Sequence, residues 1–182
     1  AVLFLHTDPN DAAQVFHMGS LIQRYRLENR VVFSGMTFFK GFDYKQMNDV
    51  YNVMDVFLLT TSGEGFGIPI LEAQSCGIPT LVTNYTTTYE LCIEPKTGLG
   101  IDLVGVEPEE NPIAHETELI DGVIVGSWNV DRGICSIKDC ARKLEILEKD
   151  NSLRLELGKN GRLNALENYS WDIIGRKWIE YI

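Results

Sequence analysis

The sequence predicts an α/β fold, in which a mostly parallel sheet is covered by helices on both faces. Short and almost continuously apolar runs alternate with segments whose apolar residues recur every three or four positions. The first pattern is typical of buried parallel strands and the second of amphipathic helices. Because parallel strands need crossover connections, the alternation favours a three-layer domain, which ends in a helical tail.

The first half of the chain supplies most of the predicted sheet. Strands are expected at 2–5, 31–33, 55–59 and 80–83, and helices at about 12–27, 44–54 and 69–76. The last of these helices begins at Pro69, whose missing N–H has no intrahelical partner in a first turn. Gly77 fits the end of that helix.

The second half combines an acidic segment with the helical tail. A further strand is expected within 99–104. Residues 106–126 contain six acidic side chains and two prolines, and we interpret them as an acidic surface excursion in which 123–125 is a candidate strand returning to the body. Helices are expected over about 136–147, 152–168 and 170–182, the first capped by Ser136 with Asp139 three residues on. At this length, one domain over 1–182 is the default.

The composition argues against several classes of protein. A net charge of −10 disfavours a nucleic-acid partner, which needs clustered positive charge. No apolar run approaches the ~20 residues of a membrane span. The four cysteines form no Cys-x-x-Cys pair and the three histidines complete no metal-ligand spacing, so no metal site is predicted. Reduced thiols in a cytoplasmic setting are expected.

The most informative segment runs from Glu64 to Glu72, where two carboxylates flank a glycine-rich turn and the start of a helix. Glycine lets the backbone come close to a ligand, and the helix start offers free N–H groups, here expected at Ile70 and Leu71, to a diphosphate. Glu72, expected in the first helical turn, is placed to accept hydrogen bonds from a ribose diol. Glu64 is placed to accept them from a second sugar, so the segment predicts a nucleotide-sugar site.

The same residues also fit a plainer interpretation. Glu72 is then a first-turn acid that favours the helix dipole, and Glu64 is a solvent-facing loop residue. An NAD-dependent oxidoreductase is disfavoured, because the first strand ends in His6-Thr7-Asp8-Pro9 and no Gly-x-Gly-x-x-Gly fingerprint follows.

A longer stretch of the sequence favours the nucleotide-sugar site over the plainer interpretation. The segment from Asp55 to Asn84, which reads DVFLLTTSGEGFGIPILEAQSCGIPTLVTN, closely resembles the signature of retaining GT-B glycosyltransferases of the family 4 type, the glycosyl transferases group 1. Glu90 falls where that family has a further glutamate. The segments 153–162 and 169–172 are similar to the family's closing helices. The resemblance covers most of the chain, and 106–126 is its least typical part.

The resemblance implies a Rossmann-like, carboxyl-terminal, donor-binding domain whose partner, an amino-terminal acceptor-side domain, is missing. It implies that Glu72 binds the donor ribose and that Glu64, the candidate catalytic residue, contacts the hydroxyls of the transferred sugar. The loop at Met36 and Thr37 matches the place where the family holds the base. The backbone that lines the sugar and diphosphate would belong to Gly65, Phe66, Gly67, Ile68, Ile70 and Leu71. Transfer would proceed with retention, without a metal or cofactor.

Two departures from the family pattern limit the expected activity. The family's phosphate-binding Arg and Lys lie in a unit that would precede Val2, and the acceptor-side domain is absent. We therefore expect a fragment of a larger enzyme that does not catalyse transfer alone. Two alternatives remain: a GT-B nucleotide-sugar epimerase and a non-catalytic nucleotide-sugar-binding module. The sequence names neither the donor (UDP-, GDP- or ADP-linked) nor the acceptor (sugar, lipid or glycan).

Overall fold

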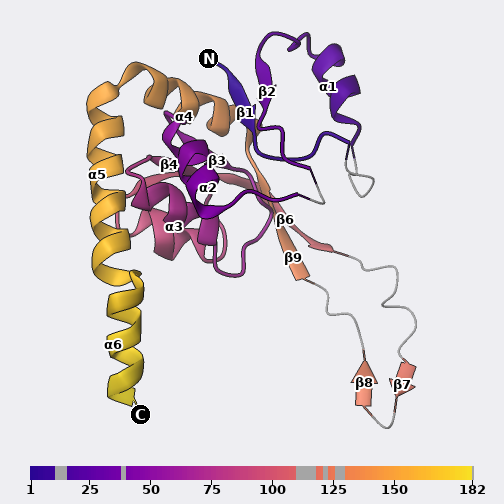
Figure 1. Ribbon diagram of the computed structural model, residues 1–182. Helices are drawn as coiled ribbons and strands as arrows, with labels where there is room; N and C mark the ends of the chain where they lie inside the picture. The colour runs from indigo at the N-terminus through magenta and orange to yellow at the C-terminus, as the bar shows by residue number, and fades with distance from the viewer. Residues whose placement is uncertain (11–15, 38–39, 110–117, 121–122, 126–129, 182) are drawn as a thin grey trace. The chain divides into compact units, whose positions relative to one another are not determined.

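The computed structural model describes residues 1–10, 16–37, 40–109, 118–120, 123–125 and 130–181 (Figure 1). The chain forms two compact units, Ala1–Met54 and Asp55–Ile182. Each unit contains its own parallel sheet, so the parallel α/β prediction is confirmed within both. Whether residues 1–182 act as one domain stays a prediction.

The first unit is built on a two-stranded parallel sheet. Strand β1 (Leu3–Leu5) pairs with β2 (Val31–Phe33), and Leu3 lies opposite Val31. Helix α1 (Met18–Arg24), which follows β1 in the chain, is shorter than the predicted 12–27 at both ends, because His17 caps its start and the helix ends at Arg24. The chain leaves the helix at Tyr25, and Arg26 takes a positive φ of 56°. The predicted residues 12–15 lie outside the described part of the chain.

Helix α2 (Tyr44–Asn52) follows β2, as the apolar spacing predicts. Asp43 caps it, since its carboxylate accepts from the Gln46 N–H while the Gln46 side chain accepts from the Asp43 N–H. This reciprocal capping box satisfies two backbone donors and fixes where the helix begins. Val50 and Tyr51 are buried in the unit.

The second unit holds a three-stranded parallel sheet in the order β3-β4-β5. Its strands are β3 (Phe57–Leu59), β4 (Thr80–Thr83) and β5 (Gly98–Ile101). Helix α3 (Ile68–Ser75) connects β3 to β4, and a π-helical turn, η1 (Tyr89–Ile93), connects β4 to β5. The π-helical turn η1 was not predicted.

Apolar side chains cover both faces of this sheet, in two clusters of different composition. The first consists of Ile70, Val82, Leu91 and Cys92, and the second of Leu81, Ile101, Leu147 and Leu157. Successive residues of β4 point to opposite faces, so Leu81 and Val82 belong to different clusters. Both faces are therefore buried, which explains why the strands are apolar along their whole length.

The predicted helical tail is confirmed. It contains α4 (Ile137–Lys149), α5 (Asn151–Asn168) and α6 (Trp171–Tyr181). Ser136 caps α4 as expected, because its hydroxyl accepts from the Asp139 N–H. Asp150 caps α5 in the same way through the Leu153 N–H. In Figure 1, α5 runs along the outside of the second unit, and it packs across α3.

The region after β5 differs from the prediction. The strand expected within 99–104 is interrupted at Asp102: β5 ends at Ile101, and a new strand, β6 (Leu103–Glu109), begins in another sheet. β6 pairs antiparallel with β9 (Val130–Cys135), which was not predicted (Figure 1).

The candidate strand at 123–125 is real, but its predicted return to the body is wrong. This strand, β8 (Val123–Val125), pairs antiparallel with β7 (Glu118–Ile120) in a two-stranded sheet of its own. The described residues of the acidic excursion 106–126, which are 106–109, 118–120 and 123–125, all belong to strands, and residues 110–117, 121–122 and 126 lie outside the described part of the chain.

Candidate functional site

The predicted glycine-rich segment links the carboxyl end of β3 to the start of α3. Gly67 precedes the helix with a φ of 87° and lies in the left-handed region, where a side chain is strained. A Cβ at this position would also lie 3.0 Å from Ile70 Cδ1 and 3.2 Å from Leu91 Cδ1. Both facts require glycine here. Pro69 occupies the first helical turn, as predicted.

One of the two predicted free N–H donors is engaged. The Ile70 N–H donates to the Gly67 carbonyl at 2.9 Å, so the expectation of a free Ile70 donor is wrong. The left-handed turn at Gly67 brings that carbonyl within reach, and this is the physical reason. A ligand on this helix start would meet the remaining first-turn donors.

Glu64 lies in the loop before α3 and is half-buried. Its N–H donates to Thr86 Oγ1 at 3.0 Å, and the Thr87 hydroxyl lies 3.4 Å from both the Glu64 and the Phe66 carbonyl oxygens. Within the described ranges, the Glu64 carboxylate makes no hydrogen bond or ion pair. Fixed backbone and an unpaired carboxylate suit a group that accepts hydrogen bonds from a ligand.

Glu72 is also half-buried, but its expected position in the first turn of α3 is wrong. The helix begins at Ile68, so Glu72 is its fifth residue and lies in the second turn. Four residues of rise carry it about 6 Å along the helix axis from Ile68. The carboxylate is thereby removed from the first turn, so it does not compete with an anionic ligand for the first-turn N–H groups other than that of Ile70, which the Gly67 carbonyl already engages.

The base of the β6–β9 hairpin lies against the Glu64 loop, a contact that was not predicted. The Gly133 N–H donates to the Ser62 carbonyl at 2.8 Å. Arg132 Nη1 lies 3.7 Å from the point where a Cβ on Gly63 would stand. The hairpin base and the loop lie about 70 residues apart in the sequence, so no local pattern indicates their contact. Only the fold brings this arginine to the loop.

The residues predicted to hold the base belong to the first unit, Ala1–Met54. Gly35 has a φ of 78°, the Met36 N–H lies 3.4 Å from Ser34 Oγ, and Thr37 forms an isolated bridge with Lys40. This local geometry is a tight turn after β2. The base-binding role of Met36 and Thr37 stays a prediction.

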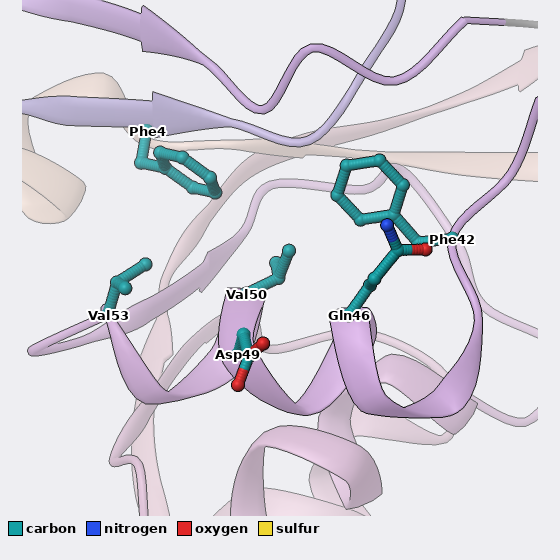
Figure 2. Close-up of a pocket in the computed structure, with 6 residues that line it drawn as sticks. All are labelled: Phe4, Phe42, Gln46, Asp49, Val50 and Val53. Atoms are coloured by element: carbon teal, nitrogen blue, oxygen red, sulfur yellow. The ribbon is translucent and has the colours of Figure 1, made fainter.

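A pocket of about 280 Å³ lies within the first unit (Figure 2). Apolar side chains from β1, from α2 and from the residues that flank α2 form most of its wall, with one amide and one carboxylate. The lining residues are Phe4, Phe42, Gln46, Asp49, Val50 and Val53. None of the predicted site residues lines it.

Among the described residues, no group of three or more His, Cys, Asp or Glu side chains is arranged to hold a metal ion. No helix there is long and apolar enough to cross a bilayer.

Residues 15–105 match the family model of the glycosyl transferases group 1, and the chain belongs to that family. It is 30% identical, over 68% of its length, to the capsular polysaccharide biosynthesis glycosyltransferase CapM of Staphylococcus aureus. It is 24% identical, over 73% of its length, to sucrose synthase 5 of Arabidopsis thaliana. The chain spans only 24% and 16% of the lengths of these two relatives.

Solved structures share the fold. The sucrose-phosphate synthase of Thermosynechococcus elongatus superposes with a TM-score of 0.69 at 20% identity, over 99% of this chain and 37% of that one. The carboxyl-terminal domain of a glycosyl transferase group 1 protein from Francisella tularensis superposes with a TM-score of 0.58 at 18% identity, over 85% of this chain and 61% of that one. The chain therefore has the fold of a GT-B carboxyl-terminal domain, as predicted.

Proposed function

We propose that the full-length protein is a glycosyltransferase that moves a sugar from a nucleotide-diphosphate sugar to an acceptor with retention. This chain is its donor-binding half. One observation carries the proposal: the family's motif forms the loop between β3 and α3, with a fixed backbone and with a Glu64 carboxylate that pairs with none of the described residues. A glycosyltransferase and a sucrose synthase among the relatives support it.

Each part of the motif has a proposed role. Glu64 accepts hydrogen bonds from the hydroxyls of the transferred sugar, and Glu72 accepts them from the donor ribose. The first-turn backbone of α3 and the Gly65–Gly67 turn face the sugar and the diphosphate, where the helix dipole favours negative charge. Met36 and Thr37 hold the base. Neither a metal nor a cofactor takes part, and the acceptor is a sugar, lipid or glycan.

A thermal-shift panel on the full-length protein tests the donor site. UDP-, GDP- and ADP-sugars are compared with UDP, GDP and ADP. A ligand that binds only the folded state raises the melting temperature by mass action, by an amount equivalent to about 2.7 kcal/mol at a hundredfold excess over Kd. We expect one nucleotide series to shift the melting temperature. A flat response to every nucleotide-sugar would contradict the donor-site proposal.

The reaction class is tested with labelled donor on the full-length protein. Sugar moved to an acceptor supports the transferase, inversion of the donor at one carbon supports an epimerase, and binding without change supports a non-catalytic module. We further propose that the isolated 182-residue chain is inactive, because the acceptor side of a two-domain cleft would be absent. Measurable turnover by that piece would refute this. A cytoplasmic location stays a prediction from the cysteine pattern.

A further inference from the structure

The backbone of Glu64 is held by a turn that lies beyond the recognised motif. This turn, residues 85–88, follows β4, and its contact with Glu64 spans 22 positions of sequence. The Thr86 hydroxyl donates to the Tyr85 carbonyl at 2.7 Å and accepts from the Glu64 N–H at 3.0 Å. One hydroxyl can do both at once, because it carries one proton and two lone pairs. The Thr86 oxygen is thus oriented by its own backbone towards Glu64.

Thr86 adopts a backbone conformation that its residue type disfavours. Its φ is 55°, in the left-handed region. A branched Cβ is crowded there, and such outliers persist where surrounding contacts impose them, often at functional sites. Glycine would adopt the same conformation freely, but it would offer no hydroxyl to Glu64. The strained backbone of Thr86 therefore occurs together with its hydrogen bond to the Glu64 N–H.

Hydrogen bonds of Tyr85 and Thr88 hold the rest of the turn in place, and with it the backbone of Thr86. Thr88 is fully buried, and its Oγ1 accepts from the Tyr85 N–H at 3.1 Å and lies 2.5 Å from the Thr83 carbonyl. The Tyr85 hydroxyl donates to the Asp131 carbonyl at 3.2 Å. The turn is tied to the end of β4 and to the hairpin base, and its Thr86 hydroxyl then reaches the Glu64 loop.

We propose that Thr86 is a positioning residue for Glu64. By holding the Glu64 amide, it keeps the loop ordered before the sugar arrives, and a ligand then binds without the entropy loss of ordering that loop. This inference rests on the proposed function, because the benefit falls on the sugar part of the donor. A nucleoside diphosphate, which lacks that sugar, gains little from it.

Three variants of the full-length protein test the proposal. Thr86→Gly removes the hydroxyl and keeps the backbone conformation accessible, so the fold is retained. Thr86→Ser keeps the hydroxyl. Lys96→Gly is the matched control, since Lys96 has the same φ of 55° and lies outside the turn and the loop. Hydrogen-exchange mass spectrometry follows the peptide that spans 62–66, and calorimetry follows UDP-glucose, GDP-mannose and ADP-glucose beside UDP, GDP and ADP.

Thr86→Gly should raise amide exchange in 62–66 and weaken binding of the recognised nucleotide-sugar roughly tenfold, the loss of one good hydrogen bond, while the bare nucleotide binds as in the wild type. Thr86→Ser should restore both properties, and Lys96→Gly should change neither. Unchanged exchange in Thr86→Gly, or equal weakening of nucleotide and nucleotide-sugar, would overturn the positioning role. If the wild type binds no nucleotide-sugar, the proposed function fails, and the exchange data still decide whether Thr86 orders the loop.

Discussion

At the scale of single residues, the two glutamates of the motif differ in how they are held. Glu64 stands on a loop whose backbone is fixed by threonine hydroxyls, and its carboxylate is unpaired among the described residues. Glu72 stands on the second turn of α3, whose backbone is regular. Their separation along the chain fits one carboxylate for each sugar of a nucleotide-sugar, with helix-start amides between them.

Alanine at each position should therefore affect different ligands. Glu72→Ala should weaken both the nucleotide and the nucleotide-sugar, because both contain the ribose. Glu64→Ala should weaken chiefly the nucleotide-sugar. Each loss should be about 1.5–3 kcal/mol, the value of a hydrogen bond to a charged group. Calorimetric titration of both ligands measures the two losses.

The control for these variants is Glu156→Ala, an exposed glutamate on α5. It removes the same charge from the same unit, so it corrects for the change in net charge. Equal losses in Glu64→Ala and Glu156→Ala would contradict a local role for Glu64.

Two glycines of the same turn should respond in opposite ways to alanine. Gly67→Ala places a Cβ at a φ of 87° and 3.0 Å from Ile70 Cδ1, so we expect a loss of about 1–3 kcal/mol in unfolding free energy. Gly65→Ala meets nothing within 4 Å, and its φ is not positive, so its stability should be close to wild type or slightly higher. Urea unfolding followed by circular dichroism measures both. A stable Gly67→Ala would show that the turn accommodates a side chain.

At the scale of helices and strands, local pattern predicted most of the αβ units. The spacing of apolar residues located α2 and the tail helices, and the apolar runs located β3 and β4, because each signal lies within one element. The hairpins after β5 were only partly found. β6 pairs with β9 across the whole of 110–129, whereas β7 and β8 are neighbours in the chain, and in both cases β-pairing depends on a partner that the apolar pattern of one strand does not show. The π-helical η1 likewise has no simple periodic signature.

The packing of α5 on α3 depends on glycine in α5. A Cβ at Gly158 would lie 2.1 Å from the Gly77 carbonyl oxygen, so Gly158→Ala must push the helices apart. Overpacking of this kind typically costs about 1–3 kcal/mol. Gly175→Ala on α6 is the matched control: nothing lies within 4 Å, and alanine should stabilise the helix by about 0.5–1 kcal/mol. Thermal unfolding of both variants checks the opposite signs, and equal behaviour would contradict the close contact.

At the scale of the whole molecule, the sequence predicted the motif but not what surrounds it. Glu64, Glu72, Gly67 and Pro69 are local to one loop and helix, so the local sequence and its family resemblance indicated them, although Glu72 lies one turn further along α3 than expected. Their supports, the turn at 85–88 and the hairpin base, come from distant parts of the chain. Only the tertiary fold brings them together, and for that reason no pattern in the motif itself indicated them.

Asp139, an acidic residue at the start of α4, is held by a network of hydrogen bonds and ion pairs. Its carboxylate accepts from Lys143 at 2.6 Å, from the Asp102 N–H at 2.9 Å and from Arg142 at 2.6 Å. The side chains of Asp139 and Lys143 are only 10% and 14% exposed. The network joins α4 to the point between β5 and β6 where the chain leaves the parallel sheet.

This network should make the stability of the second unit depend on acid pH. The Lys143 hydrogen bond, with those from Asp102 and Arg142, holds the pKa of Asp139 well below its usual range. The unfolded chain has an ordinary Asp pKa of about 3.9, so the carboxylate stabilises the fold above that value. This stabilisation is lost as the pH falls below about 4 towards the folded-state pKa, because the unfolded chain then binds the proton more readily.

Asp139→Asn tests that dependence, since the amide keeps the shape of the side chain and removes its charge. At pH 7 we expect the variant to lose about 2–3 kcal/mol of unfolding free energy, because the nearly buried Lys143 then keeps only the more distant Asp102 carboxylate, at 3.4 Å. The difference from wild type should shrink as the pH is lowered from about 5 to 2, because Asp139 of the unfolded wild-type chain binds a proton in this range while the folded-state pKa lies lower. Glu145→Gln is the control: its exposed pair with Lys149 also lowers the pKa of Glu145, but solvent screens the pair, so the variant should unfold like wild type. Urea unfolding at a series of pH values gives the comparison, and a gap between wild type and Asp139→Asn that stays constant with pH would contradict the role of the carboxylate charge.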